Sequence, residues 1–252
     1  MGNLASAVFM VRDANIDPKN ITIFEVLGSP GGSCDAAGSP EDGYIMRGGR
    51  MLNLPTMECL WGLMDSIPSI DDPSKSLYEE TKDFNSKIHT CANARLVTHD
   101  RKKVDVTTMG FDNRDRIDML RLIYADEQKM GDVKINEWFQ ESFFHTNFWL
   151  MWSSTFAFEP WHSAAELARY MRRFMHEFPR IHTLAGVHRT IYNQYDSIVL
   201  PTRKWLEERG VNFVYNACVV DLDIRVDGQK KTVTSLKVIQ DGHEKTIRGA
   251  PQ

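Results

Sequence analysis

The order of apolar and polar positions predicts alternating helices and strands along the chain. Near the start, Leu4, Val8 and Val11 recur at helical spacing, which predicts a helix over 1–14. A turn at "NIDPKN" follows, and the β-branched run "ITIFEV" at 21–26 is typical of a short buried strand. The next loop, "LGSPGGSCDAAGSPEDG", is rich in glycine, proline and serine.

The middle of the chain carries further helical patterns. Leu60, Met64 and Ile67 predict a helix that begins after Pro55 and ends near Pro68. Residues 69–113 are polar and mixed, and we expect some helix and at least one short strand there.

Two patterns follow between residues 114 and 161. Over 114–130 we expect an amphipathic helix with Ile117, Leu120 and Tyr124 on its apolar face. The stretch "EWFQESFFHTNFWLMWSSTFAFEPW" is crowded with aromatic residues. We expect most of these rings to belong to the core rather than to a site.

The run "HSAAELARYMRRFMHEF" predicts a helix with a capping box between Ser163 and Glu166. Four apolar residues form its expected core stripe: Leu167, Met171, Phe174 and Phe178. "PTRKWLEERG" has proline at its start and glycine at its end, as helices prefer. "VNFVYNACVVDLDI" and "KTVTSLKVIQ" predict two strands, the second opened by a turn at Asp227-Gly228.

Composition limits the classes of protein that need consideration. The chain has 252 residues, of which 42% are hydrophobic and 25% charged, enough for one large or two small soluble domains. A formal net charge of −4 argues against a general nucleic-acid binder. We find no repeat and no apolar run long enough to span a membrane. Arg12 and Asp13 interrupt the first apolar stretch, so we expect no signal peptide.

The four cysteines lie far apart and form no CxxC pair: Cys34, Cys59, Cys91 and Cys218. A zinc site or another metal site is therefore not expected, nor is a disulfide framework. We expect a reducing, cytoplasmic environment.

Glu25 stands at the end of the first predicted strand, about twenty residues after Gly2. In dinucleotide-binding units, an acidic residue at this place hydrogen-bonds a ribose. The alternative is that Glu25 simply ends a strand at the surface. Gly31, Gly32 and Ser33 come shortly afterwards, and backbone N–H groups in such a turn can face a phosphate or a flavin edge.

The stretch "RGGR" places Gly48 and Gly49 between Arg47 and Arg50. Glycines let the backbone approach a ligand closely, and arginines suit phosphate. A solvated basic loop is the alternative interpretation.

Six stretches, taken in order, resemble the oleate hydratase family, also called the myosin-cross-reactive antigen family: "GNLASAVFMVRDA", "IFEVLGSPGGSCDAAG", "GYIMRGGR", "ECLWGLMDSIPSI", "FFHTNFWLMWSSTFAFEPWHSAAELARYMRRF" and "NQYDSIVLP". The match covers nearly the whole chain, and "FAFEPWHSA" and "NQYDS" are not general flavoprotein motifs. The resemblance implies a carbon–oxygen hydro-lyase that adds water to the cis-9 double bond of oleic acid, giving 10-hydroxystearic acid. Linoleic acid is a further expected substrate.

The resemblance also implies FAD, which organises the site without net redox change. On that basis Arg47 and Arg50 would hold the pyrophosphate or the flavin side, and Gly48 and Gly49 would permit close approach. Glu25, Gly31, Gly32 and Ser33 would complete the cofactor site. The resemblance is compatible with a homodimer and with peripheral membrane contact.

Two positions carry the chemistry that the resemblance implies. The family usually has Glu directly after RGGR, assigned to water activation, but this chain has Met51, and a thioether is not a general base. Asn53 can orient a water molecule but is not a base either. The family's proton donor matches Tyr170, with Arg169, Arg172 and Arg173 as nearby cations. A partly buried helical tyrosine is the alternative, and we assign His162 a structural role.

These observations predict an α/β chain with an incomplete, Rossmann-like FAD-binding domain and a mainly helical insertion. Residues 1–68 and 190–252 would form the FAD domain, and 69–189 the substrate domain. Compared with the family, the first strand with its glycines and the C-terminal half are missing, so we expect a fragment with weak or absent FAD binding. The alternative functions are an inactive truncated remnant and a flavin-dependent oxidoreductase.

Overall fold

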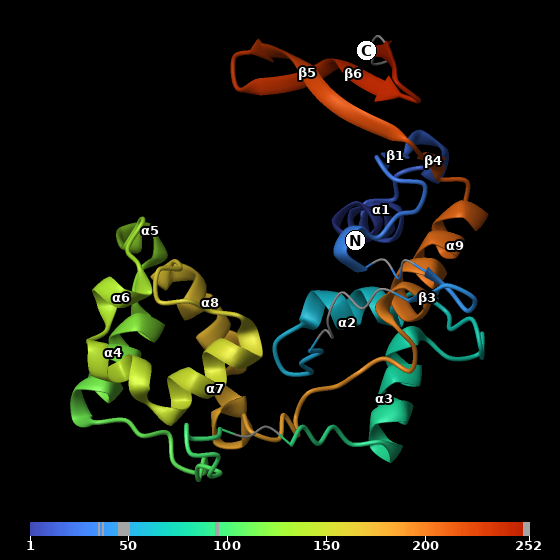
Figure 1. The fold of residues 1–252 in the computed structure, drawn as a ribbon. Helices are drawn as coiled ribbons and strands as arrows, with labels where there is room; N and C mark the ends of the chain where they lie inside the picture. Colours follow the sequence, from blue (N-terminus) through green and yellow to red (C-terminus); the bar gives the residue numbers. More distant parts are fainter. Residues whose placement is uncertain (35, 37, 45–50, 94–95, 249–252) are drawn as a thin grey trace. The chain divides into compact units, whose positions relative to one another are not determined.

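The computed structural model describes residues 1–34, 36, 38–44, 51–93 and 96–248. Helices alternate with small sheets, so the mixed α/β class predicted from the sequence is confirmed at that level (Figure 1). The chain forms two compact units. Unit 1 comprises Met1–Arg50, Glu58–Phe84 and Thr190–Gln252, and unit 2 comprises Met51–Met57 and Asn85–Arg189. The cofactor and substrate roles given to ranges 1–68, 190–252 and 69–189 stay predictions.

Among the described residues, unit 1 contains four α-helices or parts of them, three short helical turns and all the strands. The helices are α1 (Gly2–Arg12), α2 (Glu58–Asp65), α3 (Leu77–Lys87) and α9 (Leu200–Glu208), with turns η1 (Pro18–Asn20), η2 (Gly32–Cys34) and the π-helical η5 (Tyr195–Val199). The strands are β1 (Thr22–Phe24), β2 (Gly38–Ser39), β3 (Gly43–Tyr44), β4 (Asn212–Val214), β5 (Ala217–Asp227), β6 (Lys230–Gln240) and β7 (His243–Arg248).

The first strand pairs in parallel with a strand that lies far away in sequence. Residues Thr22 and Phe24 of β1 face Asn212 and Val214 of β4. The buried Leu4 and Val8 of α1 confirm the predicted helical stripe. The strand is shorter than the predicted range 21–26, because the backbone turns after Glu25 and leaves Val26 exposed.

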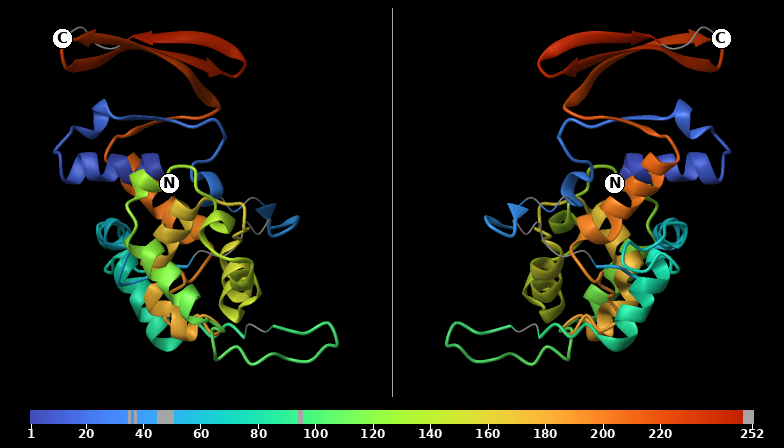
Figure 2. Two further views of the ribbon diagram at one scale, coloured as in Figure 1. Left: turned by 90° about the vertical axis from the view of Figure 1, so that its left-hand side faces the viewer. Right: turned by 90° about the vertical axis from the view of Figure 1, so that its right-hand side faces the viewer.

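The largest sheet of the described residues is an antiparallel meander in the order β5-β6-β7 (Figure 2). Asp227 faces Lys230 across the predicted turn, and Gly228 adopts φ +59°, a left-handed conformation that favours glycine. The turn and the second predicted strand are therefore confirmed, whereas the first predicted run, 211–224, divides into β4 and β5 at Asn216, which adopts φ +52°. The third strand, β7, was not predicted.

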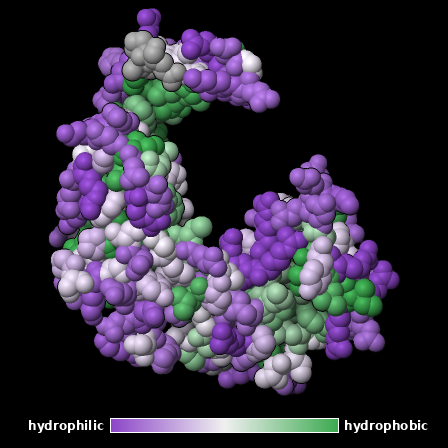
Figure 3. All heavy atoms as spheres, turned by 180° about the vertical axis from the view of Figure 1, so that it is seen from behind, coloured by the Kyte–Doolittle hydropathy of each residue, from purple (hydrophilic) through white to green (hydrophobic). Residues whose placement is uncertain are grey.

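This meander keeps many apolar side chains in contact with solvent. Hydrophobic residues are visible at the surface in the upper part of Figure 3. The exposed apolar residues of β5 and β6 are Val219, Val220, Leu222, Ile224, Val226, Val233 and Ile239. Such a surface is more apolar than a solvated sheet face usually is.

Unit 2 is a helical body around an aromatic core. Its elements are α4 (Asn113–Tyr124), α5 (Glu127–Met130), α6 (Ile135–Trp138), η3 (Glu141–His145), α7 (Asn147–Phe156), α8 (Ala164–Phe174) and η4 (Met175–Arg180). Phe143, Phe148 and Trp152 are fully buried, and their rings contact further Phe and Trp rings. The prediction that this aromatic stretch forms core is confirmed.

The predicted face of α4 is wrong. Ile117, Leu120 and Tyr124 are 57%, 56% and 84% exposed, whereas Met119 and Leu122 are buried. The helix has apolar residues on two sides, and the pattern alone did not show which side packs. The buried side also holds two acids: Asp115 belongs to a capping box with Asp112, and Asp118 contacts Arg114 and Arg121, so burial leaves neither carboxylate uncompensated.

Candidate functional site

Tyr170 lies on α8 in an aromatic wall. Helix α8 begins where the Ser163 hydroxyl accepts a hydrogen bond from the Glu166 N–H, which is one half of the predicted capping box. The predicted stripe faces the core, with Leu167, Met171 and Phe174 buried and Phe178 half-buried.

The ring of Tyr170 is half-buried, with ring centroids 5.7 Å from Phe156, 5.1 Å from Phe158 and 6.3 Å from Phe174. Among the described residues, none accepts or donates a hydrogen bond at its hydroxyl. The arrangement offers a phenolic O–H beside an apolar aromatic surface, which suits a proton donor to an apolar substrate.

Two of the three cations expected near Tyr170 bind other groups. Arg169 and Arg172 both bind the carboxylate of Glu127, at 2.7 and 2.8 Å. Arg172 also donates to the carbonyls of Ile123 and Ala125. The hydrogen bond from Arg169, together with the charges of Arg169 and Arg172, holds the pKa of Glu127 below its ordinary value. All these contacts together attach α8 to the end of α4 and to α5.

Met51 lies in the same unit as Tyr170 and packs against the same aromatic cluster. The neighbouring Leu52 pairs with His188 through two backbone hydrogen bonds of 3.1 and 2.7 Å. Burial lowers the pKa of the His188 imidazole. The two predicted catalytic positions therefore belong to one body, and Met51 adds only an apolar thioether.

The segment that follows Met51 lies along the end of α8. Asn53 is fully buried, and its amide Nδ2 lies 2.7 Å from Nε2 of His176. Thr56 donates from its hydroxyl to the carbonyl of Arg173 at 3.4 Å. No local pattern indicates the Asn53–His176 pair, because 123 positions separate the two residues.

A buried carboxylate adjoins this pair. Glu177 is 3% exposed and receives two hydrogen bonds from Arg180, of 2.9 and 2.7 Å, and one of 3.2 Å from the Gly186 N–H. His176 Nε2 lies 3.5 Å from Glu177 Oε1. Sequence reasoning named Asn53 but missed the three polar residues that cluster with it: His176, Glu177 and Arg180.

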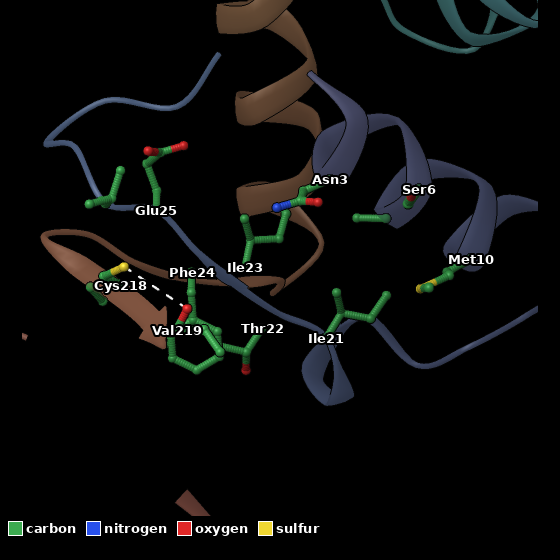
Figure 4. A pocket seen from close by; sticks show the side chains of 13 residues that line it. Asn3, Ser6, Met10, Ile21, Thr22, Ile23, Phe24, Glu25, Cys218 and Val219 are labelled. Atoms are coloured by element: carbon green, nitrogen blue, oxygen red, sulfur yellow. Dashed lines mark hydrogen bonds between the residues drawn. The ribbon is translucent and has the colours of Figure 1, made fainter. Parts of the chain in front are cut away.

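In unit 1, Glu25 lines a cavity of about 510 Å³ between α1, β1 and the start of β5. Figure 4 shows Met10 and Ile21 at one end of it, and Glu25 and Cys218 at the other. Glu25 Oε1 accepts the Leu27 N–H at 3.0 Å, which leaves the second carboxylate oxygen without a described partner. A ribose hydroxyl could donate to that oxygen.

The glycine turn does not line this cavity, although it belongs to the same unit. Gly31 and Gly32 adopt φ +125° and +58°, and a Cβ on Gly32 would meet nothing within 4 Å. The Ser29 hydroxyl donates to the Tyr195 hydroxyl at 3.0 Å, so the "NQYDS" motif fastens the loop just before the glycines. The open side of Gly32 and the free oxygen of Glu25 fit a dinucleotide in part. Ser33 stays a candidate, and Arg47, Gly48, Gly49 and Arg50 lie outside the described residues.

His162 has a local structural role, in agreement with its assignment. Its Nδ1 accepts the Glu159 N–H at 3.2 Å, and its carbonyl accepts the Ile135 N–H at 2.9 Å. The "FAFEPWHSA" motif is thereby held against α6.

Three further observations concern the described residues. They contain no cluster of His, Cys, Asp or Glu that could hold a metal ion. None of their helices combines the length and apolar character that crossing a bilayer requires. The four cysteines are free thiols.

A family model described as the MCRA family matches residues 1–252. The chain is also similar to a linoleate hydratase of Lactiplantibacillus plantarum, with 38% identity over 96% of this chain and 46% of that protein. It is 34% identical to an oleate hydratase of Streptococcus pyogenes serotype M49 (strain NZ131), over 100% of this chain and 42% of that protein. The chain thus spans less than half the length of these curated relatives.

Proposed function

Because the chain belongs to the MCRA family, we propose that it acts as a fatty acid hydratase, adding water to a double bond of oleic or linoleic acid. The observation that carries the proposal is the family match over the whole chain, together with two relatives named for this activity. We assign the enzyme to the hydro-lyases, with 10-hydroxystearic acid as the product from oleic acid.

Tyr170 acts as the proton donor in this proposal. Its phenol stands against the aromatic rings of Phe156 and Phe158, which would provide an apolar surface for an acyl chain. Protonation of an alkene requires such a dry contact between donor and carbon, because bulk water would otherwise compete for the proton.

FAD is the cofactor of the proposal, and when bound it would organise the site without net redox change. Glu25 would accept a hydrogen bond from the ribose, and the turn at Gly31, Gly32 and Ser33 would approach the phosphates. Arg47, Gly48, Gly49 and Arg50 would complete the site in a Rossmann-like domain.

A hydration assay with the purified chain, FAD and oleic acid tests the proposal, with the product identified by mass spectrometry. We expect 10-hydroxystearate to form without added reductant and without oxygen, and Tyr170→Phe to lower the rate by about 10²-fold or more. Tyr124→Phe is the matched control, because Tyr124 is 84% exposed on α4.

The alternatives give different results in the same assay. A requirement for oxygen or a reductant would indicate a flavin-dependent oxidoreductase. The absence of product under all conditions would indicate an inactive remnant, an outcome to which the apolar Met51 would contribute.

A further inference from the structure

The motif "NQYDS", residues 193–197, folds into a locally closed turn that runs into the π-helical η5. The Asn193 side-chain oxygen accepts the Asp196 N–H at 2.9 Å, and the Asn193 carbonyl accepts the Ser197 N–H at 3.0 Å. These bonds hold the backbone of Tyr195 in place. Single π-helical turns of this kind are frequent at functional sites.

From this turn, the Tyr195 side chain reaches a loop that is 166 positions away in sequence. Its hydroxyl accepts a hydrogen bond of 3.0 Å from the Ser29 hydroxyl, and the bond is partly shielded from solvent. The buried Pro30 follows Ser29, and its ring fixes φ of the one residue between Ser29 and Gly31. Holding Ser29 therefore holds the start of the glycine turn.

We propose that Tyr195 is a positioning residue for the dinucleotide, an inference that rests on the proposed function with FAD as its cofactor. By binding Ser29, Tyr195 holds the turn at Gly31, Gly32 and Ser33 in the conformation that receives the phosphates. Tyr195 acts through the loop and needs no contact with the dinucleotide. The motif "NQYDS" thereby supports the cofactor site.

The first part of the same loop is held by other groups. Glu25 Oε1 accepts the Leu27 N–H at 3.0 Å, and the Leu27 carbonyl accepts the Asn216 N–H at 3.4 Å. Ser29 supplies the next contact along the chain. The Ser29–Tyr195 bond is thus the anchor that directly precedes the turn.

A glycine turn benefits from such an anchor, because glycine loses more conformational freedom on ordering than any other residue. Gly31 and Gly32 adopt φ +125° and +58°, a region that glycine enters readily but does not prefer over others. A turn that is already held loses less entropy when a ligand binds, so its affinity for that ligand is higher.

The anchor lies at the end of the sheet where a ligand is expected. Glu25 and Tyr215 directly follow the parallel strands β1 and β4, and open parallel sheets bind ligands outside the carboxyl ends of their strands. Tyr215 interacts electrostatically with Tyr195, and burial raises the pKa of the Tyr215 phenol. A hydrogen bond in such partly dry surroundings is stronger than one in water.

Tyr192, the residue before Asn193, provides a matched control. Its hydroxyl donates to Asp71 Oδ2 at 2.8 Å, so it ties the same segment to a different loop. The substitution Tyr192→Phe removes a bond of the same kind and leaves the Ser29–Tyr195 bond in place.

Four variants of the chain test the inference: Ser29→Ala, Tyr195→Phe, the double variant and Tyr192→Phe. Hydrogen exchange of segment 26–34 is measured without ligand by mass spectrometry, and the affinity for FAD by equilibrium dialysis. We expect Ser29→Ala and Tyr195→Phe each to speed exchange in this segment and to weaken FAD binding by about three- to tenfold. The double variant should be no weaker than the single ones, because both substitutions remove one bond. Tyr192→Phe should match the unaltered chain in both measurements.

The two measurements separate the failure of the inference from the failure of the proposed cofactor. Unchanged exchange in segment 26–34, or unchanged FAD affinity in both single variants, would overturn the inference and leave FAD as the cofactor. Additive losses in the double variant, or an equal loss in Tyr192→Phe, would overturn it as well. No detectable FAD binding by the unaltered chain would overturn the proposed cofactor, and the inference with it.

Discussion

At the residue scale, the close packing around Glu177 restricts which side chain position 186 can hold. A Cβ placed on Gly186 would lie 1.9 Å from Glu177 Oε1 and 2.2 Å from an Arg180 guanidinium nitrogen. The carboxylate is buried and receives three hydrogen bonds, so it has little room to move aside.

We therefore predict that Gly186→Ala lowers the free energy of unfolding by about 1–3 kcal/mol, because the added methyl displaces the buried Glu177 carboxylate from its ion pair with Arg180. Thermal or urea unfolding followed by circular dichroism measures this. Gly62→Ala is the control: a Cβ there meets nothing within 4 Å, and alanine in a helix should be neutral or slightly stabilising. Equal effects of the two substitutions would contradict the prediction.

Individual residues also show where the sequence sufficed and where it did not. The cap at Ser163 and the turn at Gly228 were predictable, because their chemistry is local. The pairing of Asn53 with His176 was not predictable, since it depends on which distant segments pack together.

At the element scale, the cationic side of α8 binds an acidic residue of α5. Glu127 of α5 binds Arg169 and Arg172, and this lowers the pKa of the Glu127 carboxyl below 4.5. A carboxyl whose pKa is lower in the folded state stabilises that state above its unfolded pKa, and the stabilisation is lost as pH falls through the folded pKa.

We predict that Glu127→Gln lowers the melting temperature at neutral pH and that its difference from the unaltered chain shrinks as the pH falls below about 4.5. Melting curves at a series of pH values measure the difference. Glu141→Gln, at a residue that is 86% exposed, should change little at any pH. A difference for Glu127→Gln that grew on acidification would show that the ion pair is not responsible.

Helices α4 and α8 show when apolar periodicity predicts the buried side of a helix and when it does not. In α8 one apolar stripe opposes a charged face, and the predicted side is the buried one. In α4 two apolar stripes compete, and burial of Met119 and Leu122 is decided by tertiary packing that the local sequence does not record.

At the scale of the whole molecule, the candidate residues are divided between the two units. Glu25 and the glycine turn belong to unit 1, and Tyr170 and Met51 belong to unit 2. The sequence predicted the mixed α/β class, but it did not show that segment 51–57 belongs to unit 2, because this depends on the pairing of Leu52 with His188.

The parallel sheet of unit 1 consists of β1 and β4, with three residues each, among the described residues. So small a sheet offers a narrow platform for a dinucleotide. We predict that the chain purified alone carries FAD well below one equivalent, measured by flavin absorbance and by fluorescence titration. Stoichiometric yellow flavin that copurifies with the chain would contradict this.

One feature of the Glu25 cavity makes such binding measurable at the site itself. Cys218 lines the cavity as a free, exposed thiol, whereas the other three cysteines lie outside the lining. A chain in which only Cys218 is retained would accept one thiol-reactive fluorophore at the cavity wall. The emission of that dye would respond to a nucleotide entering beside Glu25, so the protein carries its own attachment point for an optical sensor.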